Sequence, residues 1–146
     1  MVSQDIVDGL NLARDIMQTS DSSVVVIKNS QILTKKKGDG IRPLIEAIEE
    51  LDEQMQGAII GDRILGKASA LLCRYANASA VYSPQGTKTA IALLIIGGIP
   101  SQIEQMIPFI KNRFGDGMCP FEKMLENVTE PEEAYEILKE RLLMGK

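Results

Sequence analysis

Hydrophobic positions in the first half of the chain follow two different periods. They recur every three or four residues between Ile6 and Met17 and again between Ile41 and Leu51, which is the spacing of amphipathic helices. Between these stretches come a β-branched run, the turn-prone pair Asn29-Ser30 and a short apolar pair, a pattern typical of a β-hairpin. The predicted elements are a helix capped by Ser3 and ending near Thr19, hairpin strands at Val24–Ile27 and Ile32–Leu33, and a helix that follows Gly38-Asp39-Gly40.

From Gly57 onward strand and helix patterns alternate, which is typical of a parallel sheet covered by helices. A capping box formed by Thr129 and Glu132, with Pro131 in the first turn, marks the start of a final helix. The remaining predicted elements are strands at Gly57–Gly61, Ser79–Ser83 and about Pro100–Gln105, and helices from about Leu65 to Tyr75, Thr87 to Ile96 and Phe121 to Glu126.

This order of elements predicts an α/β fold, a three-layer α-β-α sandwich around a mixed five-stranded sheet. Right-handed crossovers give the strand order 2-1-3-4-5, in which the first hairpin strand is antiparallel to its neighbours. In such sheets a ligand crevice opens at the carboxyl ends of the parallel strands. We therefore expect residues 38–43, 62–67 and 83–87 to meet there, within a single domain over residues 1–146.

The composition removes several classes of function. The chain of 146 residues has 16 Lys and Arg against 20 Asp and Glu, a formal net charge of -4, two Cys and no His. The lack of His excludes the Ser-His-Asp triad and the common His-bearing zinc sites. Two Cys alone do not supply the three or four ligands that zinc takes, so we expect neither a metal nor a cofactor. The acidic balance argues against binding of nucleic-acid polymers.

The pattern of charged and apolar residues also bears on location. The first nine residues contain Asp5 and Asp8 and no basic residue, unlike the start of a secretory signal. The longest apolar run, Ala90–Ile99, is too short for a membrane helix, and two Cys without a secretory signal are typical of reduced thiols. We expect a cytoplasmic protein with no membrane partner. Because the predicted helix in this run is apolar nearly all round, a second subunit is one way to cover it, so a homo-oligomer is expected.

Three segments carry a resemblance to a known family: GDGIRPL at 38–44, GDRILGKASALL at 61–72 and NRFGDGMCPFEK at 112–123. Together with the order of elements, they resemble an uncharacterised prokaryotic domain family that has the fold of the cytidine deaminases. The resemblance covers roughly Ser22–Lys139 and implies a cytidine-deaminase-like fold without a known reaction.

The same resemblance also shows what the chain lacks. In deaminases of this fold, a His-Ala-Glu or Cys-Ala-Glu motif and a Pro-Cys-x-x-Cys motif open the two helices that hold zinc. Here those places read Gly40-Ile41-Arg42-Pro43 and Ile64-Leu65-Gly66-Lys67, so the deaminase reaction is not implied.

In place of zinc ligands the sequence offers Arg42 and Lys67, each near the N-terminus of a predicted helix. Two cations and two helix N-termini predict a pocket for a small anionic ligand, and the fold suggests a nucleotide-like one. The alternative is that both cations are solvated and pair weakly with Asp39 or Asp62. The candidate ligand-binding residues are Arg42, Asp62, Gly66, Lys67, Ser69, Ser83, Thr87, Asn112 and Arg113.

Gly61-x-x-x-x-Gly66-Lys67 also mimics a phosphate-binding P-loop between a strand and a helix. However, Ala68 stands where the motif needs a Ser or Thr for magnesium, Asp62 adds a negative charge, and Ile64-Leu65 are bulky where phosphate needs bare backbone. We therefore do not expect a nucleoside triphosphatase.

A second candidate chemistry lies in residues 112–122. Cys119 precedes a short predicted helix with Arg113 close in sequence, an arrangement that favours a nucleophilic thiolate, with Glu122 as proton acceptor or ligand contact. The alternative is a helix-initiating turn in which Cys119 is a small buried residue and Glu122 bonds backbone amides of the first turn. Cys73 is expected to pack in the core.

Three functions thus stay open on the sequence alone. The first is a zinc-free domain that binds a small anionic ligand. The second is a thiol enzyme that uses Cys119 for sulfur or acyl transfer. The third is a non-catalytic interaction domain that forms oligomers.

Overall fold

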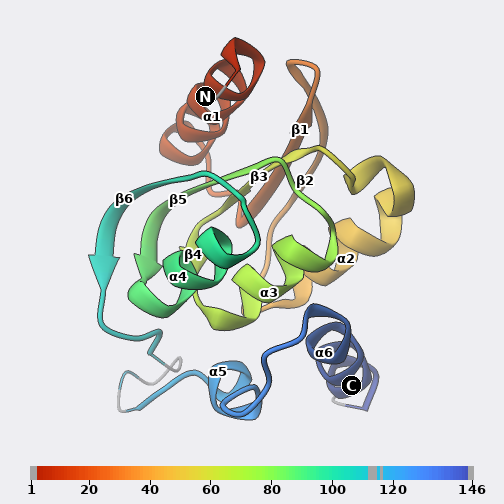
Figure 1. Ribbon diagram of the computed structural model, residues 1–146, viewed down its shortest axis with the longest axis vertical. Helices are drawn as coiled ribbons and strands as arrows, with labels where there is room; N and C mark the ends of the chain where they lie inside the picture. The colour runs from red at the N-terminus through yellow and green to blue at the C-terminus, as the bar shows by residue number, and fades with distance from the viewer. Residues whose placement is uncertain (1–2, 112–114, 116, 145–146) are drawn as a thin grey trace.

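The computed structural model describes residues 3–111, 115 and 117–144 (Figure 1). Its elements in chain order are α1 (Gln4–Thr19), β1 (Val24–Lys28), β2 (Gln31–Lys36), α2 (Arg42–Leu51), the 3-10 helix η1 (Asp52–Met55), β3 (Ile59–Asp62), β4 (Ile64–Leu65), α3 (Lys67–Tyr75), β5 (Ala80–Thr87), α4 (Lys88–Ile96), β6 (Ser101–Ile107), α5 (Pro120–Met124) and α6 (Pro131–Met144).

The strands form one mixed sheet in the order β2-β1-β3-β5-β6, and the short β4 continues β3 along β5. β1 is antiparallel to both β2 and β3, whereas β3, β5 and β6 are mutually parallel. The strands β5 and β6 are the predicted fourth and fifth strands, because the short β4 was not predicted. The predicted order 2-1-3-4-5 with an antiparallel first strand is therefore confirmed. The three-layer arrangement is also present, with α1 on one face and α2, α3 and α4 on the other (Figure 1).

Local sequence explains the first helix and the hairpin. Ser3 caps α1 by accepting a hydrogen bond from Ile6 N at 3.3 Å. Asn29 and Ser30 join β1 to β2 with φ angles of 53° and 62°, the left-handed conformation that two-residue hairpin turns favour. All four residues of Val24–Ile27 are buried, because β1 lies inside the sheet with helices on both of its faces.

The split between β3 and β4 corrects two predicted boundaries. The strand was predicted to end at Gly61 and the helix to include Leu65, but Leu65 pairs with Gly86 in the sheet and α3 begins at Lys67. In the parallel ladder along β5, Gly61 pairs with Tyr82 and Ile64 pairs with Gln85, and the pairing is interrupted between them. Pro84, which has no N–H to donate, lies in this interruption. Strand β5 continues past this interruption to Thr87, four residues beyond its predicted end at Ser83.

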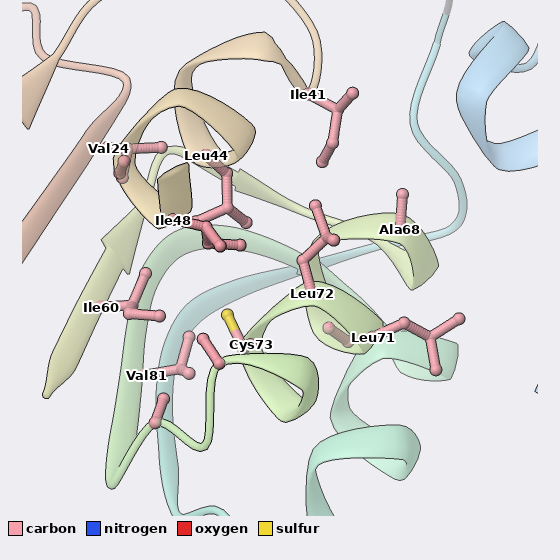
Figure 2. Packing of buried hydrophobic residues seen from close by; sticks show 14 of the residues in the cluster. Val24, Ile41, Leu44, Ile48, Ile60, Ala68, Leu71, Leu72, Cys73 and Val81 are labelled. Carbon is pink, nitrogen blue, oxygen red and sulfur yellow. The ribbon is translucent and has the colours of Figure 1, made fainter. Parts of the chain in front are cut away.

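Two hydrophobic clusters lie on the two faces of the sheet. Leu10, Ala13 and Met17 of α1 pack against β1, β3 and β5 in the smaller cluster. The larger cluster joins α2, α3, α4 and α6 to the opposite face, and Figure 2 shows its side chains gathered between the sheet, α2 and α3. Cys73 is fully buried in this cluster, as predicted. No helix in the described part of the chain is long and apolar enough to cross a membrane.

The final helix packs against α2 and α3 through aromatic and charged contacts. The rings of Tyr75 and Tyr135 stack with centroids 4.2 Å apart, and Lys139 Nζ lies 2.8 Å from Glu49 Oε2. The helix begins at Pro131, and the Glu130 carbonyl accepts the Ala134 N–H, so Glu130 rather than Thr129 occupies the N-cap position. Proline favours the first helical position and keeps the residue before it out of the helix, which accounts for the shift.

The burial of α6 yields a stability prediction. Leu138 is fully buried against the core, whereas Leu143 on the same helix is 62% exposed. We expect Leu138→Ala to lower the free energy of unfolding by about 2–5 kcal/mol, because it removes buried methyl groups and leaves a cavity. Leu143→Ala should change it by less than about 0.5 kcal/mol. Urea denaturation of both variants measures the difference, and equal effects would contradict the packing of α6.

Candidate functional site

The carboxyl edge of the sheet is covered by the short helix α5. Phe121 lies against Gly40 before α2, where a Cβ would come within 2.9 Å of the ring. Glu122 lies against Gly66 before α3, where a Cβ would collide with the carboxylate. α5 therefore rests on the starts of both helices at which the sequence predicts an anion site. Since β4 pairs with Gln85-Gly86, segments 62–67 and 83–87 are neighbours there as well.

The Glu122 carboxylate caps α3. Its Oε1 accepts the N–H of Lys67 at 2.8 Å, and its Oε2 accepts the N–H of Ala68 at 2.9 Å. The first N–H groups of a helix have no partner within the helix, and Gly66 at the N-cap has no side chain to supply one. A carboxylate from 55 positions along the chain fills that role. The α3 N-terminus therefore holds a negative group in this structure, and that group belongs to the chain itself.

Lys67 and Arg42 occupy the helix-start positions predicted for them. Lys67 is the first residue of α3, and its Nζ donates to the Glu126 carbonyl at 3.1 Å. Arg42 is the half-buried first residue of α2. The lysine thus adds a second tie between α3 and the α5 segment, beside the carboxylate bridge.

Asp62 is a buried carboxyl at the end of β3, beside the start of α3. Burial raises its pKa to about 7, and the negative charge of Glu122 adds to this rise. Hydrogen bonds from the Ser69 hydroxyl and from the backbone N–H groups of Ile64 and Arg63 oppose the rise without cancelling it. A carboxyl group with a raised pKa therefore lies beside the helix start that Glu122 caps.

The other predicted ligand-binding residues have local roles or are not described. The Ser83 hydroxyl donates to the Gln85 carbonyl and accepts the Gln85 N–H, while Thr87 caps α4 by accepting from Ala90 N. Both hydroxyls are thus used by the backbone around them. Asn112 and Arg113 lie outside the described residues.

Cys119 is the N-cap residue of α5, and its side chain is partly exposed rather than buried. Its carbonyl accepts the N–H groups of Glu122 and Lys123. The alternative prediction placed the Glu122 carboxylate on backbone amides in the first turn of its own helix. This is wrong, because the carboxylate bonds to the first amides of α3 instead. The segment from Gly61 to Lys67 that mimics a P-loop contains strand β4 at Ile64–Leu65. The backbone of these two residues pairs with β5 and does not form a phosphate-binding loop.

Two open cavities lie elsewhere in the described part of the chain. One of about 350 Å³ is lined by Arg74, Asn77 and Gly97, and another of about 290 Å³ by Tyr75 and Tyr135 among others. Both are near the C-terminal end of α3, opposite to the predicted anion site. At the predicted site, the Glu122 carboxylate of α5 occupies the start of α3.

Comparison with known proteins adds the family. A family model described as a domain of unknown function, DUF1893, matches residues 12–142. The chain belongs to the DUF1893 family. A solved DUF1893 protein from Thermotoga maritima is similar to this domain with a TM-score of 0.84 and 24% sequence identity, over 97% of this chain and 92% of that one. None of the curated proteins matches the sequence.

A second solved structure bears on the predicted fold of the DUF1893 domain. RibD from Acinetobacter baumannii is similar with a TM-score of 0.53 and 13% identity, over 69% of this chain and 36% of that one. This likeness confirms the predicted cytidine-deaminase-like fold and says nothing of activity. Within the described residues, no three His, Cys, Asp or Glu side chains are grouped so that they could hold a metal ion.

The cap on α3 can be tested by substitution. Glu122→Gln retains the size of the side chain but replaces one accepting oxygen with an NH₂ group, so one α3 N–H loses its partner. We expect the free energy of unfolding to fall by about 1–3 kcal/mol. Glu126→Gln is the matched control, because only its backbone carbonyl contacts Lys67. Equal stability of Glu122→Gln and the control would contradict the cap.

The raised pKa of Asp62 gives a pH dependence of defined sign. The folded protein holds this proton more tightly than the unfolded chain, whose carboxyl titrates near 3.8. The free energy of unfolding should therefore fall as the pH rises from about 4 to about 7, by at most about 1.4 kcal/mol per pH unit, and level off above that range. Denaturation at several pH values should show this slope in the wild type and not in Asp62→Asn. NMR titration can measure the pKa of Asp62 directly. A carboxyl that is already fully ionised at pH 5, about one unit above its ordinary pKa, would contradict the raised pKa of Asp62.

Proposed function

We propose that this DUF1893 domain binds a small molecule through an anionic group, which replaces the Glu122 carboxylate at the start of α3. The observation that carries the proposal is the pair of hydrogen bonds from Lys67 N and Ala68 N to that carboxylate. Successive free N–H groups at the positive end of a helix accept phosphate or carboxylate oxygens in the same way. Glu122 would then be an internal occupant, in the position of the ligand's anionic group.

The surroundings of α3 favour an exchange of one anion for another. Lys67 places its ammonium group at the start of the helix, and Gly66 keeps the approach free of a side chain. Because Phe121 and Glu122 of one short helix reach the starts of α2 and α3 respectively, a ligand that replaces them would meet Arg42 as well as Lys67. A phosphate with an attached polar group, as in a nucleotide, has the charge and extent that these positions suit.

Helix α5 contributes no buried residue to the core, and of its side chains Phe121 packs against the larger hydrophobic cluster. None of the residues Pro120–Met124 is buried, whereas Leu125, directly after the helix, is fully buried. The hydrogen bonds of Glu122 and the contact of Phe121 would be lost on release, but Leu125 would stay as an anchor. Incoming negative charge replaces the outgoing carboxylate, so the electrostatic balance around Asp62 is preserved.

Isothermal titration with inorganic phosphate and with a nucleoside monophosphate tests this proposal. Glu122→Ala removes the internal competitor, so we expect at least roughly tenfold tighter binding of both probes than in the wild type. Adding Lys67→Ala to that variant should weaken binding by about tenfold, because a charged partner is lost. Glu126→Ala is the control and should bind as the wild type does.

Two outcomes would overturn the proposal. One is a folded Glu122→Ala variant, checked by circular dichroism, that binds neither probe at millimolar concentration. The other is binding that Lys67→Ala leaves unchanged, since the anion would then lie elsewhere.

A further inference from the structure

Helix α4 presents an apolar face to solvent. Ala90 and Leu94 point into the core and are fully buried, whereas Ala92, Ile95 and Ile96 lie on the outer side of the helix. Ile95 is 69% exposed and Ile96 70%, the highest values among the exposed large apolar side chains of the described residues. Adjacent apolar side chains left in water on one helix mark an interaction surface.

The charges at the two ends of α4 indicate what covers this face. The helix begins with the exposed cation Lys88, has no acidic residue in its first turn and has no basic residue in its last turn. This arrangement opposes the helix dipole, which favours negative charge at the start and positive charge at the end. A second α4 running in the opposite direction would correct both ends, because each Lys88 would lie beside the C-terminal carbonyls of the other helix.

We propose that two copies of the chain form a two-fold dimer by packing α4 against α4 in antiparallel orientation. The surface between Lys88 and the end of the helix carries no charge, so it matches an identical apolar surface. Ala92 stands at the midpoint of Lys88–Ile96, where a two-fold axis would cross the helix, and its small side chain allows close approach. A self-complementary patch of this kind is what a two-fold interface requires. The dimer does not depend on the proposed anion site, because it involves neither α5 nor the start of α3.

The mass of the protein in solution tests the dimer. Light scattering should give twice 16.0 kDa for the wild type. The double variant Ile95→Asp/Ile96→Asp should be a monomer with an unchanged circular dichroism spectrum, because neither side chain is needed in the core. Leu143→Asp, at an apolar position of similar exposure on α6, should remain a dimer. A monomeric wild type, or a dimer that survives the double substitution, would overturn the proposal.

Disulfide cross-linking tests the direction of packing, in a Cys119→Ser background that leaves only the buried Cys73. Ala92→Cys should cross-link two chains on mild oxidation, because the two copies of this position face each other at the axis. Lys88→Cys should not, since the antiparallel arrangement separates its copies by about 12 Å along the helices, beyond the reach of a disulfide. Cross-linking at both positions would indicate parallel packing. Cross-linking at neither position would indicate a different interface. Either result refutes the antiparallel dimer.

Reversing the terminal charge separates this dimer from unspecific association of apolar surfaces. Lys88→Glu places a favourable charge at the start of its own helix but sets that charge against the carbonyls of the second copy. We expect the dissociation constant of the dimer to rise several-fold while the thermal midpoint of the dissociated chain does not fall. An equal or lower dissociation constant would exclude the antiparallel arrangement.

Discussion

Two hydrogen bonds from the backbone of α3 to the Glu122 carboxylate connect the C-terminal part of the chain to the sheet. The requirement behind them is general, because backbone N–H groups at a buried helix start must find an acceptor. Gly66 is buried and has no side chain that accepts, so the acceptor has to come from elsewhere in the fold. The same requirement accounts for the contact between α5 and the start of α3.

Asp62 shows how the sheet shapes this environment. The ladder beside β5 is interrupted opposite Pro84, directly after Asp62 at the end of β3. Burial raises the pKa of this carboxyl to about 7, and the nearby charge of Glu122 adds to the rise.

The likeness to RibD and to the Thermotoga maritima protein shows a shared fold, which by itself assigns no function. By the resemblance in the sequence, the two helix starts that hold zinc in deaminases carry Arg42 and Lys67 here. At this edge of the sheet the structure places the two cations, the capping carboxylate of Glu122 and the short helix α5. The exposed face of α4 lies on a separate surface, so the proposed dimer and the proposed anion site can be tested independently.

The element types, the strand order and the burial of Cys73 followed from the sequence, because hydrophobic period, caps and turn residues act over a few neighbouring positions. The positions of Arg42 and Lys67 at helix starts followed for the same reason. The sequence left Leu65 in a helix and Glu122 in its own first turn, since both depend on partners far along the chain. Leu65 is in a strand because β5 offers it a pairing edge, and Glu122 bonds to α3 because the folded layers bring residues 55 positions apart into contact. Hydrogen-bond partners across such separations, and the burial that raises the pKa of Asp62, exist only once the sheet and its helices have closed around them.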